Sequence, residues 1–299
     1  MPRPSQTRAY AALILIVTLW GSYPAATKLA LQDFPPFFLG AVRCTIASGF
    51  LLLLLARAGA DAARALTPAA LGSFLVLGIS GIAVSTQLSY VAIYYTTAAN
   101  TAILQAATPV MVALGARFYL GERLRRAQWA GVALSALGVL VVITNGRLAA
   151  LTPQELRAGD FINLVALAGW AAYTVYGTRV LATHSPMLAT TAAYVLGTLL
   201  LIPTAILTAP LFPAPRLGSG LAWGFVLYQA LAGAVAHIWW YRSVDVIGPS
   251  RSAIFMNLQP VVGLALARGI LAERIGLWQV VGTALVLGGV ALTTRGSGR

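Results

Sequence analysis

Charged residues are scarce in this sequence: Asp, Glu, Lys and Arg make up 9% of 299 positions, whereas apolar residues make up 59%. An ordinary water-soluble domain carries about 25% charged and about 45–50% apolar residues. So few charged side chains cannot cover the outside of a soluble fold, and lipid must be the solvent for most of the surface. The composition therefore excludes a soluble globular protein and predicts an all-α integral membrane protein.

The residues of several common active sites are also missing. Cys44 is the only cysteine, so no intrachain disulfide can form. There is no Walker loop, no His-Glu-x-x-His zinc helix and no Gly-x-Ser-x-Gly nucleophile elbow. No carboxylate is evident in the middle of an apolar run, so an acidic proton relay has no candidate. We expect neither an enzyme nor an ATP-driven pump, and neither a cofactor nor a metal.

Positive charge is what the sequence has in excess, with a formal net charge of +13. The basic residues lie in short runs between apolar stretches and not on one face or in a tail. This placement is typical of cytoplasmic loops of membrane proteins and argues against nucleic acid as a partner. The lipid bilayer is the expected partner.

Ten apolar runs are long enough to cross about 30 Å of hydrocarbon. The first five are Tyr10–Ala30, Pro36–Ala56, Ala69–Tyr90, Ala98–Leu120 and Ala127–Thr144. The other five are Phe161–Leu181, Met187–Thr208, Leu221–Tyr241, Pro249–Ala267 and Leu277–Thr294. With the N-terminus in the cytoplasm, most loop arginines fall on the cytoplasmic side. We therefore predict ten transmembrane helices in a bacterial inner (plasma) membrane, with both termini cytoplasmic.

An internal repeat divides the chain into two halves, residues 1–150 and 151–299. Shifting the sequence by 151 positions places one half on the other without a gap. The matched pairs include Tyr90 with Tyr241, Pro109 with Pro260, Glu122 with Glu273, Gln128 with Gln279 and Gly131 with Gly282. Five helices per half is an odd number, so the second half must enter the membrane in the opposite sense. Inverted repeats around a central cavity are typical of secondary transporters, although duplication kept only for folding is the alternative.

Several motifs resemble the EamA-type branch of the drug/metabolite transporter superfamily. They are Trp20-Gly21-Ser22-Tyr23-Pro24, Lys28, Arg43, and the Thr108-Pro109 and Gln259-Pro260 segments followed by Gly121-Glu122-Arg123 and Ala272-Glu273-Arg274. Within that family the chain is similar to the bacterial aromatic amino-acid exporters of the YddG type. The resemblance implies ten helices around a central cavity, with the fifth and tenth peripheral. The segment Trp170-Ala171-Ala172-Tyr173 departs from the pattern, because it lacks the glycine of Trp20-Gly21.

Polar and aromatic residues that share helix faces are the candidates for a substrate cavity. They are Gln87, Tyr90, Tyr94, Thr101, Gln105, Trp170, Tyr173, His237, Trp240, Tyr241, Ser252 and Gln259. Polar side chains on matching faces of repeated helices are expected to face a shared wet space, and aromatic ones could stack on a ligand. Helix-to-helix hydrogen bonds and an interfacial aromatic belt are the alternatives.

Four further residues complete the candidate site. Lys28 and Arg43 lie at membrane depth and could bind the carboxylate of a zwitterion, although snorkelling to the interface explains them equally well. Pro109 and Pro260 interrupt apolar runs and could act as gating hinges or simply shape their helices. Glu122 and Glu273, each next to an arginine, are expected to be structural.

We therefore predict an alternating-access exporter of amino acids, aromatic or hydrophobic ones above all, and of related metabolites. A transporter in the same fold for another small solute or drug is the nearest alternative. A non-transporting membrane or lipid-handling protein is the alternative from a different class.

Overall fold

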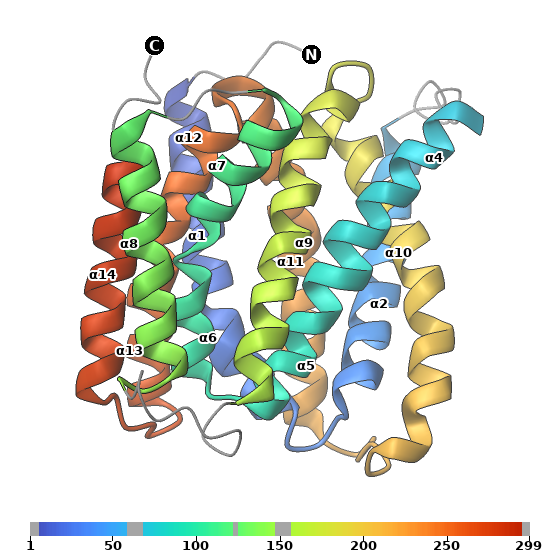
Figure 1. Ribbon diagram of the computed structural model, residues 1–299. Helices are drawn as coiled ribbons and strands as arrows, with labels where there is room; N and C mark the ends of the chain where they lie inside the picture. The colour runs from blue at the N-terminus through green and yellow to red at the C-terminus, as the bar shows by residue number, and fades with distance from the viewer. Residues whose placement is uncertain (1–5, 59–67, 122–124, 147–156, 295–299) are drawn as a thin grey trace.

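A computed structural model describes residues 6–58, 68–121, 125–146 and 157–294, and its regular elements in these ranges are all helices. They form one upright bundle, in which the start of α1 and the end of α14 lie at the same end (Figure 1). We call this end the terminal end. The opposite end, where α1 leads into α2 and α5 into α6, is called the junction end.

The first half of the chain contains the elements that Figure 1 colours from blue to green. They are α1 (Gln6–Ala30), α2 (Pro36–Arg57), α4 (Pro68–Leu77), η1 (Gly78–Thr86), α5 (Gln87–Tyr95), α6 (Ala98–Gln105), α7 (Thr108–Tyr119) and α8 (Arg126–Ile143). The second half continues with α9 (Ala158–Leu181), α10 (Pro186–Thr208), η2 (Ala209–Leu211), α11 (Gly220–Ile247), α12 (Pro249–Ile254), η3 (Phe255–Leu258), α13 (Gln259–Gly269) and α14 (Leu277–Thr294).

Seven of the helical stretches are long and apolar enough to cross a membrane, by length and composition. They are α1, α2, the continuous stretch from α4 to α5, α8, α9, α10 with η2, and α11. An eighth stretch, α6 with α7, passes the same test as a pair bent by 40°. The two remaining expected spans coincide with the interrupted segment α12–η3–α13 and with α14. The chain is therefore a multi-pass membrane protein built from helices.

Small residues bring α8 and α14 into direct backbone contact, as the repeated glycines of these runs lead one to expect. A Cβ atom on Gly289 would lie 2.5 Å from the carbonyl oxygen of Gly131, and one on Gly138 would lie 2.8 Å from that of Gly282. The two contacts are reciprocal, because Gly131 and Gly282, like Gly138 and Gly289, occupy equivalent positions of the repeat. Figure 1 shows α8 and α14 side by side at one edge of the bundle.

The middle of the third expected span is wound as a π-helix, η1, over nine residues. Its hydroxyl side chains take up freed carbonyl groups: Thr86 Oγ1, for example, donates to the carbonyl oxygen of Gly81 at 3.0 Å. Gly81 is obligatory at this point, because any Cβ atom there would clash with the ring of Tyr173 on α9. π-Helical segments often mark functional sites, and η1 supplies part of the cavity described next.

Candidate functional site

A cavity lies inside the bundle among helices of both halves. Together with the space that opens outward at its mouth, it takes in about 680 Å³ of empty space. The described lining residues are mostly aromatic, hydroxyl or amide side chains: Trp20, Tyr23, Pro24, Thr27, Arg43, Ser85, Thr86, Ser89, Tyr90, Ile93, Gln105, Thr108, Leu167, Trp170, His237, Met256 and Gln259.

The cavity extends from the middle of the bundle toward the junction end. On α1 its lining runs from Trp20 to Thr27, which is the half of the helix that leads to α2. On η1 and α5 the lining runs from Ser85 to Ile93, which is the part that leads to α6. The terminal halves of the same helices contribute nothing to the lining, because side chains fill the space there.

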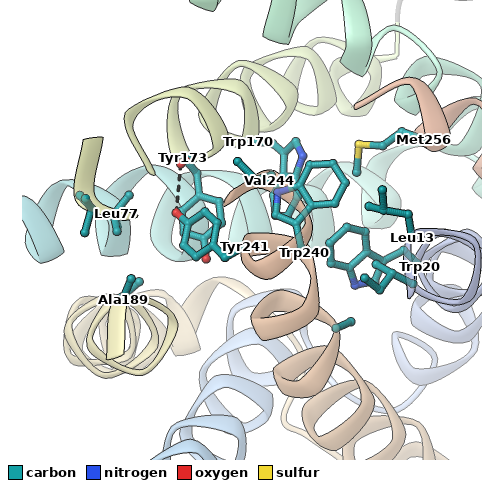
Figure 2. Packing of buried hydrophobic residues seen from close by; sticks show 14 of the residues in the cluster. Leu13, Trp20, Leu77, Trp170, Tyr173, Ala189, Trp240, Tyr241, Val244 and Met256 are labelled. Atoms are coloured by element: carbon teal, nitrogen blue, oxygen red, sulfur yellow. Dashed lines mark hydrogen bonds between the residues drawn. The ribbon is translucent and has the colours of Figure 1, made fainter. Parts of the chain in front are cut away.

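That filling is a layer of aromatic rings from α1, α9 and α11, which we call the aromatic layer (Figure 2). It consists of Trp20, Trp170, Tyr173, His237, Trp240 and Tyr241. Trp20 and Trp170 meet edge to face with ring centroids 5.1 Å apart, and Trp170 lies 5.5 Å from Trp240. Tyr173 and Tyr241 stack at 4.6 Å, and the Tyr241 hydroxyl donates to the carbonyl oxygen of Tyr173 at 3.0 Å. These contacts close the cavity on the side of the terminal end.

Four polar atoms of the aromatic layer are buried without a hydrogen-bond partner among the described residues. They are Nε1 of Trp170, Nε1 of Trp240, Oη of Tyr173 and Nε2 of His237. His237 Nδ1 lies 2.8 Å from the carbonyl oxygen of Gly233, so a neutral ring carries its proton there and leaves Nε2 as an acceptor. Buried polar groups are normally paired, and Trp170 and His237 line the cavity. The unpaired atoms of these two residues therefore lie in the wall of the cavity.

Arg43 places a guanidinium in the wall of the cavity, although its side chain is only 2% exposed. Its Nε and Nη2 both donate to the carbonyl oxygen of Gln229, at 3.2 and 3.1 Å. Nη1 reaches the sulfur of Cys44 at 3.7 Å, and the group lies 5.5 Å from the ring centre of Tyr194. Gly233 leaves room for the guanidinium, because a Cβ atom there would push Nη2 aside. All of these partners are uncharged.

Gln229 joins four helices around the cavity. Its carbonyl oxygen accepts from Arg43 on α2 and, at 3.4 Å, from the hydroxyl of Tyr23 on α1. Its side chain accepts from the Tyr90 hydroxyl on α5 at 2.7 Å and donates to Thr27 on α1 at 3.2 Å. This network fixes the positions of lining residues from α1, α2 and α5 relative to α11.

The structure brings together six of the site residues predicted from the sequence. The six that line the cavity are Arg43, Tyr90, Gln105, Trp170, His237 and Gln259. Tyr173, Trp240 and Tyr241 lie in the aromatic layer, buried next to the cavity without lining it. Among the predicted residues that line the cavity, the side-chain oxygen of Gln105 also has no described partner.

Two predicted residues of the third span point elsewhere. Gln87 is buried against α2, where its side chain donates to the carbonyl oxygen of Pro36 at 3.0 Å. Tyr94 is 37% exposed, and its ring meets that of Phe212 at 5.5 Å. Both belong to the packing of the helices and not to the cavity lining.

Thr101 and Ser252, which are equivalent in the repeat, also lie away from the cavity. Each hydroxyl donates to a carbonyl oxygen four residues earlier, that of Thr97 at 3.0 Å and that of Gly248 at 2.9 Å. Gln105 and Gln259, which were predicted on shared helix faces with them, do line the cavity. Gln105 lies in α6 together with Thr101, whereas the segment η3 separates Gln259 from Ser252. In both halves the predicted residues are therefore divided between packing and lining.

Pro109 and Pro260 each lie in the first turn of a helix that follows such an interruption. Pro109 starts α7 after the 40° bend, and Pro260 starts α13 directly after the 3₁₀ segment η3. A proline fits the first turn, where its missing N–H costs nothing. Neither proline lines the cavity, but each follows a residue that does, Thr108 and Gln259 respectively.

Lys28 lies outside the lining, at the junction end. Its Nζ donates to the carbonyl oxygens of Ile93 and Thr96 at 2.9 and 2.7 Å, and so caps the end of α5. Asp160, fully buried at the start of α9, accepts from the Thr96 hydroxyl at 2.5 Å and from Asn100 Nδ2 at 3.1 Å. Charged side chains from both halves thus hold the connection between α5 and α6.

Glu273 completes this junction from the loop between α13 and α14. Its two carboxylate oxygens accept from the backbone N–H groups of Ala98 and Ala99 at 3.0 and 2.9 Å, at the start of α6. A carboxylate at a helix N-terminus satisfies free donors and complements the helix dipole. Glu122, its equivalent in the first half, lies outside the described residues.

Sequence reasoning missed Gln229, Tyr23 and the small polar residues of η1 and α5, as well as Asp160. The signal for Gln229 was present, because it is a polar residue within the apolar run Leu221–Tyr241. Asp160 was overlooked because it stands just before the run that begins at Phe161, where a carboxylate is usually solvated. No group of three or more His, Cys, Asp or Glu that could hold a metal occurs in the described ranges.

Comparisons with known proteins agree with this architecture. A model of the EamA-like transporter family matches residues 7–144 and again residues 157–295. The chain is 32% identical over 225 residues to YyaM, an uncharacterized transporter of Bacillus subtilis, covering 75% of this chain and 73% of YyaM. It is 25% identical to YedA, an uncharacterized inner membrane transporter of Escherichia coli, over 96% of this chain and 90% of YedA.

Two further similarities extend over nearly the whole chain. A probable amino-acid metabolite efflux pump of Salmonella typhimurium is 28% identical, over 95% of this chain and 93% of the pump. A solved crystal structure superposes with a TM-score of 0.67 at 21% sequence identity and covers 96% of both chains. At that identity the superposition shows the fold alone.

Proposed function

The chain belongs to the EamA-like transporter family of the drug/metabolite transporter superfamily, and on that premise we propose that it is a secondary transporter exporting amino acids and related metabolites. The observation that carries the proposal is the cavity itself. A hollow walled by indole and phenol rings, amide groups and one guanidinium lies inside a bundle of apolar helices. An amphipathic solute with an apolar body and a polar head fits this mixture.

The proposed architecture is ten transmembrane helices in two inverted halves, residues 1–150 and 151–299. In it, α6–α7 and α12–η3–α13 are equivalent interrupted spans, and α8 and α14 are the fifth and tenth spans. The reciprocal contacts between α8 and α14 support this arrangement, because two equivalent helices related by a twofold axis must exchange contacts in this way. An axis in the membrane plane would relate them, as in other transporters with inverted repeats.

Alternating access is the mechanism that this architecture suggests. The cavity extends toward the junction end and is closed at the terminal end by the aromatic layer. In the opposite state, the equivalent helices of the two halves would exchange these roles. The interruptions before Pro109 and Pro260 are the proposed hinges, since a broken helix can bend there without losing further backbone hydrogen bonds.

Amino acids are proposed as substrates on two grounds. Aromatic rings and amides surround the cavity and can pack against a hydrophobic side chain while polar atoms meet its head group. The similar Salmonella protein is described as a probable amino-acid metabolite efflux pump. We further propose an inner-membrane location with both termini cytoplasmic, from the distribution of arginines and from the similar inner membrane transporter.

Transport by the purified protein in proteoliposomes tests the proposal. Vesicles preloaded with unlabelled phenylalanine or leucine should accumulate the labelled amino acid by exchange, and empty liposomes should not. Adding nucleobases, sugars or cationic drugs as competitors would reveal a different solute. If no amino acid moves and none competes, the proposed substrate class is wrong.

A further inference from the structure

The cavity has a charge imbalance that bears on what can bind there. Of its described lining residues Arg43 carries a full charge, and none is Asp or Glu. No described carboxylate lies within 4 Å of the Arg43 guanidinium, and an ion pair among the described residues joins Arg216 to Asp33 instead. A buried charge without a counterion is costly in a membrane interior. An anionic ligand would remove that cost.

The guanidinium is also oriented so that one edge is left for a ligand. Nε and Nη2 both donate to one carbonyl oxygen, that of Gln229, which uses the side edge of the planar group. Nη1 has only the sulfur of Cys44 at 3.7 Å, a weak acceptor. One further N–H on each of Nη1 and Nη2 forms the end edge of the guanidinium, and the hydroxyl of Tyr23 lies close to this group. The end edge has the geometry that binds a carboxylate in a bidentate manner.

A positively charged group would find no such partner. The acceptors around the cavity are uncharged: the amide oxygens of Gln105 and Gln259, Nε2 of His237 and the lining hydroxyl groups. Neutral acceptors can pair with an ammonium, but equally with a hydroxyl or with water. An ammonium therefore finds no carboxylate among the described lining residues and, near Arg43, meets a like charge.

We infer, on the basis of the proposed function, that Arg43 binds the carboxylate of the substrate and that the substrate's ammonium is dispensable. The substrate class is then apolar or aromatic monocarboxylates, with or without an α-amino group. Amines that have the same apolar body but no carboxylate are excluded.

Three probes with one phenyl body test this inference: phenylalanine, 3-phenylpropionate and 2-phenylethylamine. Binding to the full-length protein in lipid nanodiscs is measured by competition with labelled phenylalanine or, if that does not bind, with labelled 3-phenylpropionate. We expect 3-phenylpropionate to bind within about 10-fold of phenylalanine and the amine at least about 100-fold more weakly, as for loss of a buried charged pair. An amine that binds as tightly as the acid overturns the inference, and so does the absence of binding by both acids.

Two variants test whether Arg43 is the residue that binds the carboxylate. Arg43→Gln should bring the acids down to the affinity of the amine, while Arg57→Gln, at the exposed end of the same helix, should change nothing. Unchanged discrimination in Arg43→Gln overturns the assignment. If that variant does not fold, Gly233→Ala serves instead, because its Cβ atom would displace Nη2 without altering charge. It should reduce the preference for acids over the amine.

The outcome is separable from the proposed function. Acids that bind in nanodiscs but do not move in proteoliposomes contradict transport and leave the inference standing. Transport in which the amine moves as well as the acids contradicts the inference and leaves transport standing.

Discussion

Some residues of the first half line the cavity, whereas their equivalents in the second half are buried beside it. In the first half Arg43, Ser89 and Tyr90 line the cavity. Their equivalents 151 positions later are Tyr194, Trp240 and Tyr241, which are fully buried and fill the corresponding space. The tyrosine is shared, whereas Arg43 is replaced by a tyrosine and the small hydroxyl side chain of Ser89 by the indole of Trp240. A duplicated scaffold can hold one asymmetric site when side chains at equivalent positions differ in charge and size.

The variant with the largest expected effect removes a bulky side chain of the aromatic layer. Trp240→Ala deletes the largest fully buried side chain of the aromatic layer and should cost about 3–5 kcal/mol of stability. The measurement is the midpoint of thermal unfolding in detergent. Trp129→Ala is the matched control, because Trp129 is 46% exposed and its loss leaves no cavity. Equal midpoints for the two variants would mean that the aromatic layer does not fill the terminal end.

The next variant tests the charged junction between α5 and α6. The equivalent connection in the second half, between α11 and α12, has no such buried carboxylate among the described residues. Asp160 is equivalent to Ala9, so the network with Thr96 and Asn100 has no counterpart at the terminal end. Asp160→Asn replaces an acceptor oxygen with a donor next to hydrogen-bond donors, and should cost about 1.5–3 kcal/mol. Thermal midpoints measure the loss. Asp245→Asn, at an exposed site on α11, should be nearly neutral, and a comparable loss there would count against a specific network.

Lys28 and Arg179 form another equivalent pair with different surroundings. Lys28 donates to two carbonyl oxygens at the end of α5, whereas Arg179 lies 4.0 Å above the ring of Tyr119. Lys28→Met leaves both carbonyls without this donor and should cost about 1–2 kcal/mol. Arg179→Met should cost about 0.5–1 kcal/mol, as for an exposed cation–π contact. The reverse order of thermal midpoints would show that Lys28 does not secure the junction.

Most of the membrane-spanning helices were predictable from the sequence, but the winding of η1 was not. The apolar runs predicted where α1, α2, α8, α9, α10 and α11 occur, since length and hydropathy alone decide whether a segment suits a bilayer. The π-helical winding of η1 was not predictable from periodicity. It depends on the close approach of α9, through the contact between Gly81 and Tyr173.

The site was predictable only in part, for a geometrical reason. Helical spacing shows which residues share a face, but the neighbouring helices decide whether that face meets the cavity or another helix. Gln105 and Thr101 illustrate this, because one lines the cavity and the other does not. Gln229 was missed because its role depends on three helices that are distant in sequence.

The variants with the smallest expected effect compare two equivalent tyrosines, Tyr90 and Tyr241. Tyr90→Phe removes the hydroxyl that donates to Gln229 at the cavity wall, and Tyr241→Phe removes the one that donates to Tyr173 behind it. Each lost hydrogen bond is worth about 0.5–1.5 kcal/mol. In Tyr90→Phe the loss should weaken substrate binding by roughly 2- to 10-fold, because Gln229 also holds Arg43. In Tyr241→Phe it should lower the thermal midpoint and leave the dissociation constant unchanged. Equal effects on binding would mean that both tyrosines contact the substrate, so that the site would not be confined to the first half's side of the cavity.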